Sequence, residues 1–93
     1  MNPDGAVARC WTLGVQVQGV GYRPFVYRLA HKLAVGGFVQ NRGGTVTVVA
    51  EGRADVLDAF GQALIASAPA LADPRVLACI ALPPTGNHSF HHT

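Results

Sequence analysis

The chain of 93 residues has few charged side chains and no long apolar segment. Lys, Arg, Asp and Glu together make up 13% of it, and the net charge is +2 with neutral histidines. The seven basic residues are spread along the chain, whereas nucleic-acid-binding domains usually cluster them on one face. No apolar run approaches the ~18 residues of a membrane-spanning helix. Residues 1–5 lack the basic and apolar regions of a signal peptide. We therefore expect neither nucleic acid nor membrane as a partner, and a cytoplasmic location.

Cysteine and histidine are also scarce. Cys10 and Cys79 lie far apart in the sequence and do not form a metal-type pair. Thiols in the cytoplasm stay reduced, so two free, half-buried cysteines are expected rather than a disulfide. His31 is expected on the surface of a helix, and the other three histidines belong to the last residues of the chain. No metal or other cofactor is expected.

Apolar residues, by contrast, make up 49% of the chain, which is typical of a globular domain. Their periodicity predicts a strand, a helix, two strands, a helix and a strand. The expected strands cover 9–18, 37–41, 45–51 and 76–82, and the expected helices cover 23–34 and a segment that contains 55–65. This βαββαβ order predicts an α+β, ferredoxin-like sandwich, an antiparallel sheet with two helices on one face. We expect one domain over 1–93, with a core of about 9–82 and a flexible tail at 83–93. Within that tail, residues 87–93 are either a short extra strand around Phe90 or a frayed end.

The candidate for chemistry is the loop between the first strand and the first helix. It reads Gln18, Gly19, Val20, Gly21, Tyr22 and Arg23. Its two glycines free the backbone, and backbone N–H groups at a helix N-terminus favour anions. Arg23 adds a full charge and a planar fork that matches phosphate oxygens. The pattern indicates a phosphate-binding loop, and the alternative is an ordinary tight turn. It is neither a Walker loop nor a dinucleotide fingerprint, because the lysine of the first and the third glycine of the second are absent.

The wider sequence resembles a known family. Val17-Gln18-Gly19-Val20-Gly21-Tyr22-Arg23 resembles the acylphosphatase signature, and Gly37-Phe38-Val39-Gln40-Asn41 followed by Gly44-Thr45-Val46 resembles the family's second motif. The resemblance covers roughly residues 9–82. Tyr22 replaces the more usual Phe, and Val15 stands where the family usually has Gly. The continuation Arg23-Pro24-Phe25-Val26-Tyr27-Arg28-Leu29-Ala30 resembles the N-terminal acylphosphatase-like domain of the HypF-type hydrogenase maturation carbamoyltransferases.

The resemblance implies hydrolysis of acyl phosphates, with carbamoyl phosphate as the expected substrate and the other domains of a maturation carbamoyltransferase as possible partners. It gives Arg23 and the loop the role of holding the phosphoryl group, and Asn41 that of aiming a water. The mechanism that it implies needs no metal and no covalent intermediate. The alternative is a binding module that holds carbamoyl phosphate or another phosphorylated ligand without hydrolysing it. An RNA-binding ferredoxin-like module is disfavoured, because residues 45–49 have none of the aromatics that its third strand should carry.

Overall fold

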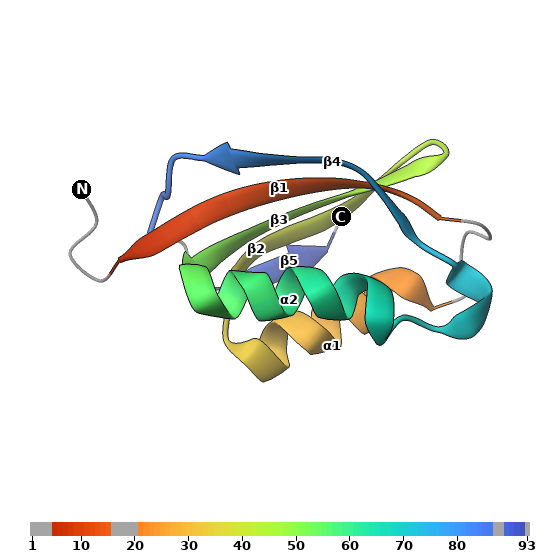
Figure 1. Ribbon diagram of the computed structural model, residues 1–93, viewed down its shortest axis with the longest axis horizontal. Helices are drawn as coiled ribbons and strands as arrows, with labels where there is room; N and C mark the ends of the chain where they lie inside the picture. The colour runs from red at the N-terminus through yellow and green to blue at the C-terminus, as the bar shows by residue number, and fades with distance from the viewer. Residues whose placement is uncertain (1–4, 16–20, 87–88, 93) are drawn as a thin grey trace.

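Five strands and two helices form two layers in the computed structural model, which describes residues 5–15, 21–86 and 89–92 (Figure 1). The elements are β1 (Ala6–Gly14), α1 (Tyr22–Leu33), β2 (Gly36–Arg42), β3 (Thr45–Arg53), α2 (Ala54–Ala66), a short 3-10 turn (Ala70–Ala72), β4 (Arg75–Leu82) and β5 (Phe90–His92). Their order agrees with the sequence prediction, and most ends differ from it by a few residues. β3 continues through Gly52, where the sequence pattern predicts a break. No helix in these described parts is long and apolar enough to cross a membrane.

The sheet has the strand order β4-β1-β3-β2-β5. β1 pairs antiparallel with β3 and β4, and β2 pairs antiparallel with β3. Both helices cover the same face of this sheet (Figure 1). The predicted ferredoxin-like sandwich is thereby confirmed. One feature of the prediction is corrected, because β5 pairs parallel with β2 and makes the sheet mixed.

The core lies between the sheet and the helices. Along β3 the side chains of Val46, Val48 and Ala50 are buried, because alternate residues of a strand point to one face. Trp11 of β1 meets Phe60 of α2 edge to face, with ring centroids 5.5 Å apart. Gly61 makes this approach possible, since a Cβ at that position would lie 3.2 Å from the Trp11 ring.

The segment after β4 contributes a residue to the core. Phe90 is 4% exposed, and its ring centroid lies 6.4 Å from that of Phe60. The crossover that carries the chain from β4 to β5 is bound by Glu51, whose carboxylate is buried. The Thr85 backbone N–H and hydroxyl donate to Oε1 at 2.9 and 3.0 Å, and the Gly86 N–H donates to Oε2. Of the two alternatives for the last residues, the structure has the short strand.

β4 is exposed along its length, although its alternating apolar residues resemble those of a half-buried strand. Val76, Leu77 and Ile80 are 47%, 59% and 56% exposed. The strand lies at an edge of the sheet, and its register with β1 shifts between Thr12 and Leu13. Position in the sheet therefore determines its exposure.

The two cysteines lie on these neighbouring strands, and both are free, as the sequence predicts. Cys10 pairs with Ile80 and Cys79 pairs with Trp11, so the two thiols lie on opposite faces of the sheet. Cys10 is half-buried, whereas Cys79 is exposed. Burial, and secondarily the nearby Cys79 thiol, raise the pKa of Cys10 above its ordinary value.

Candidate functional site

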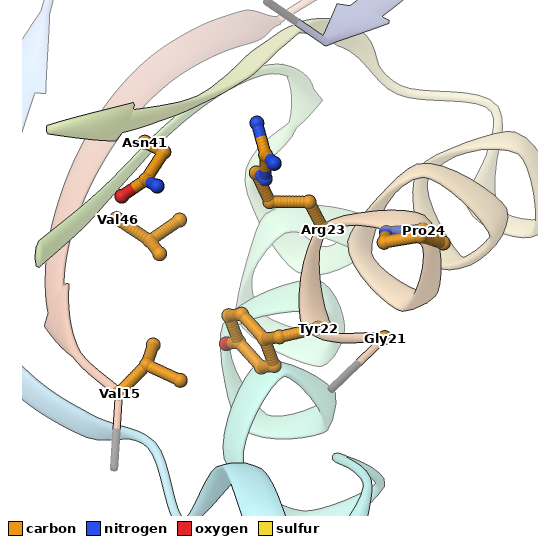
Figure 2. Close-up of a pocket in the computed structure, with 7 residues that line it drawn as sticks. All are labelled: Val15, Gly21, Tyr22, Arg23, Pro24, Asn41 and Val46. Atoms are coloured by element: carbon orange, nitrogen blue, oxygen red, sulfur yellow. The ribbon is translucent and has the colours of Figure 1, made fainter. Parts of the chain in front are cut away.

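A cavity of about 180 Å³ lies between the start of α1 and the strands beside it. Gly21, Tyr22, Arg23 and Pro24 line it from the helix, and Val15, Asn41 and Val46 line it from the opposite side (Figure 2). These positions are far apart in the sequence. The fold brings them together because the chain after β1, the end of β2 and the beginning of β3 meet at one end of the sheet.

The first turn of α1 gives the cavity a positive electrostatic character. Gly21 precedes the helix in a left-handed conformation, with φ of +86°, which a glycine adopts without strain. The N–H of Phe25 donates to the Gly21 carbonyl at 3.0 Å and closes the first turn. That turn contains no acidic residue, and no side chain among the described residues caps it. The positive end of the helix dipole therefore lies at the cavity together with the Arg23 guanidinium.

Arg23 and Asn41 lie on facing sides of this cavity. Figure 2 shows the Arg23 side chain leaving the start of α1 and the Asn41 side chain leaving β2. Asn41 pairs with Val46, and Val46 pairs with Leu13. The carboxamide thus shares a cross-strand row with two buried side chains, on the face that the helices cover. The structure brings these two predicted site residues to one cavity.

Tyr22 lines the cavity with its ring, and its hydroxyl has another partner. The side chain is buried, and the hydroxyl donates to the Leu64 carbonyl of α2 at 2.9 Å. Burial raises the pKa of Tyr22 above its ordinary value, so the phenol stays neutral. Its role in the described structure is to join α1 to α2 and to shape the cavity wall.

The remaining predicted loop residues, Gln18, Gly19 and Val20, lie outside the described residues. Three cavity residues, Val15, Pro24 and Val46, are absent from the sequence-based site. Val46 has a signal in the sequence, because Val46, Val48 and Ala50 alternate along the predicted strand 45–51 and so share one face, close in sequence to Asn41. Val15 follows Leu13 by two residues, and the same alternation places both on one side. Within 5–15, 21–86 and 89–92, no three His, Cys, Asp or Glu side chains form a group that could hold a metal ion.

Fold and site together define a ferredoxin-like domain with a small cavity that joins an arginine, a helix N-terminus and an asparagine. The family model for acylphosphatase matches residues 9–91. The chain therefore belongs to the acylphosphatase family.

Solved structures and curated relatives agree with this assignment. The crystal structure of an acylphosphatase from Bacillus subtilis superimposes with a TM-score of 0.79 at 28% identity, covering 94% of this chain and 98% of that one. A full-length HypF, crystallised in a phosphate- and nucleotide-bound form, matches with a TM-score of 0.81 at 26% identity over 95% of this chain and 12% of that one. The carbamoyltransferase HypF2 of Cupriavidus necator is 46% identical over 71 residues, which are 76% of this chain. The matched regions span 9% and 10% of the two carbamoyltransferase relatives from Cupriavidus necator and Rhizobium leguminosarum bv. viciae.

Proposed function

We propose that this chain hydrolyses acyl phosphates to a carboxylate and inorganic phosphate in the cavity between Arg23 and Asn41. One observation carries the proposal. A guanidinium on the first turn of α1 and a carboxamide at the end of β2 line one cavity of about 180 Å³. The guanidinium can bind a phosphoryl dianion, and the neutral carboxamide can orient a water.

The chemistry of an acyl phosphate suits so small a set of groups. The bond to be broken is a mixed anhydride, and its leaving carboxylate has a conjugate acid with a pKa of about 4. It departs as an anion near neutral pH and needs no general acid. The remaining tasks are to hold the phosphoryl group, to offset the charge on its oxygens and to direct the nucleophile in line.

Each task has a residue. Arg23 and the N-terminus of α1 bind the phosphoryl oxygens and offset their charge. The Asn41 carboxamide oxygen accepts a hydrogen bond from a water and holds it opposite the leaving carboxylate. The water oxygen forms the new P–O bond, the bond to the acyl oxygen breaks, and the proton passes from the attacking water to the phosphate product or to solvent. Gln18, Gly19 and Val20 are proposed to supply further backbone N–H donors.

Carbamoyl phosphate is the substrate that we propose within this class, and the other domains of a hydrogenase maturation carbamoyltransferase are the proposed partners. Support comes from the relatives named carbamoyltransferase HypF and from the size of the cavity, which suits a short acyl group. A cytoplasmic location is part of the same proposal.

The test is phosphate release from acetyl phosphate and carbamoyl phosphate, corrected for spontaneous hydrolysis. Arg23→Ala should lower kcat/KM about 100-fold or more, as removal of a charge-stabilising donor does. Asn41→Ala should lower kcat with little change in KM. Arg28→Ala removes an exposed arginine from the same helix and serves as the matched control with unchanged turnover. Full activity in Arg23→Ala would exclude this site.

The second candidate is a module that binds carbamoyl phosphate or another phosphorylated ligand without hydrolysing it. It is favoured by the small share of its carbamoyltransferase relatives that the chain spans, since a neighbouring domain could consume the bound ligand. Protection against thermal unfolding by phosphate, without turnover of either acyl phosphate, would select this candidate over the hydrolase.

A further inference from the structure

We propose that Val15 limits the size of the acyl group, and so makes the site selective for acyl phosphates with a short acyl chain. This inference rests on the proposed function and names its substrate class. Val15 lines the Arg23 cavity, and it also lines a second hollow together with Gly14, Gly44, Asp73 and Arg75. Val15 therefore borders both spaces, and in this proposal its side chain has the role of the wall between them.

The position and shape of Val15 suit it to this role. It directly follows β1, and Leu13, two residues earlier, is fully buried. The neighbouring Gly14 has no side chain that could close the gap if Val15 were truncated. A β-branched side chain has few allowed rotamers, so this wall does not swing aside easily.

The orientation of the substrate explains why the wall at Val15 would limit the size of the acyl group. Arg23 and the helix N-terminus hold the phosphoryl group, and Asn41 holds the attacking water. In-line displacement then places the acyl group on the side of the phosphoryl group away from Asn41, which in Figure 2 is the side of Val15. A cavity of about 180 Å³ is smaller than the roughly 300–1,000 Å³ of pockets for drug-sized ligands. A carbamoyl or acetyl group fits such a space, whereas an aromatic acyl group needs the volume beyond Val15.

Val46 is less suited to set this limit. It is 4% exposed and is paired on both sides, with Leu13 and with Asn41. Truncation there would open a hole in the core and disturb the row that holds Asn41. Val15 is only partly buried, and its truncation would join two spaces that already exist.

The experiment compares a short and a bulky acyl phosphate in variants that move the wall in opposite directions. With acetyl phosphate and benzoyl phosphate, Val15→Ala should raise the benzoyl-to-acetyl ratio of kcat/KM about 10-fold or more, the size expected for a change of one or two methyl groups in a pocket. Val15→Leu should lower the same ratio. Val7→Ala makes the same truncation at the other end of β1 and should leave the ratio unchanged. Loss of stability cannot produce opposite changes in Val15→Ala and Val15→Leu.

Binding gives a readout that does not depend on turnover. Acetylphosphonate and benzoylphosphonate, in which a C–P bond replaces the scissile linkage, should show the same order of relative affinities by calorimetry. If the wild type binds these compounds without hydrolysing acyl phosphates, the proposed hydrolase fails while a shifted ratio still supports Val15. Equal ratios in folded Val15→Ala and Val7→Ala would overturn the inference, and so would a wild type that neither binds nor hydrolyses any of these compounds.

Discussion

Among single residues, Tyr22 shows how one hydroxyl can connect the site to the rest of the fold. Its phenol donates to the buried Leu64 carbonyl at 2.9 Å, while its ring lines the cavity. Tyr22→Phe keeps the ring and deletes the hydrogen bond, so we expect the free energy of unfolding to fall by about 1 kcal/mol. In a domain of this size that corresponds to a drop in Tm of roughly 4–8 °C. Acetyl phosphate turnover at 25 °C should change little, because the cavity wall stays in place. An unchanged Tm would contradict this reading of the hydroxyl.

The pH dependence of the same variant provides a second check. Burial raises the pKa of Tyr22 in the folded chain above its ordinary value, which is about 10 when the chain is unfolded. The contribution of this group to stability is therefore complete below pH 10 and is lost as pH rises toward the higher folded pKa. The stability difference between wild type and Tyr22→Phe should narrow above pH 10 in urea titrations.

At the scale of elements, the meeting of β2, β3 and β5 depends on Gly37. Its φ is +132°, and a Cβ there would lie 1.9 Å from the Val49 carbonyl oxygen. Its N–H also donates to the Ser89 carbonyl at 2.8 Å, where β5 begins. Gly37→Ala should destabilise the domain by about 3 kcal/mol or more, because backbone atoms must shift in two strands. Gly44→Ala is the matched control, since nothing lies within 4 Å of a Cβ there. Urea unfolding should separate the two variants, and equal midpoints would contradict the argument.

The elements also differ in how far the sequence predicts them. Local periodicity is sufficient for α1 and β3, where Val46, Val48 and Ala50 alternate on one face. It is insufficient for β5, which is three residues long, buries Phe90 and depends on pairing with β2. The contact of Glu51 with the crossover at Thr85 and Gly86 is equally non-local. The exposure of β4 follows from its place at the sheet edge, which its own alternation does not contain.

The residues of the candidate site also differ in how far the sequence predicts them. Arg23 and Asn41 can be predicted because each belongs to a motif with a recognisable spacing, and the topology then brings their strand and helix ends together. Val15 has no motif of its own. Its position beside two hollows depends on how the end of β1 lies relative to Asp73 and Arg75, which the residues around it do not encode locally.

For the whole molecule, the cavity exists only when the start of α1 and the end of β2 are folded against each other, so a ligand that binds there must stabilise the fold. At a phosphate concentration about ten times its Kd, this linkage adds about 1.4 kcal/mol to the free energy of unfolding, which raises the Tm by roughly 6 °C or more.

Arg23→Ala should abolish this shift in Tm, because the charge-assisted hydrogen bonds to phosphate are lost. Arg28→Ala should retain it, and chloride at equal ionic strength should not reproduce it. Asn41→Ala should also keep the shift, since its proposed partner is the attacking water. Differential scanning calorimetry without added anion, with phosphate and with chloride checks these expectations, and a shift that survives in Arg23→Ala would locate the anion elsewhere on the molecule.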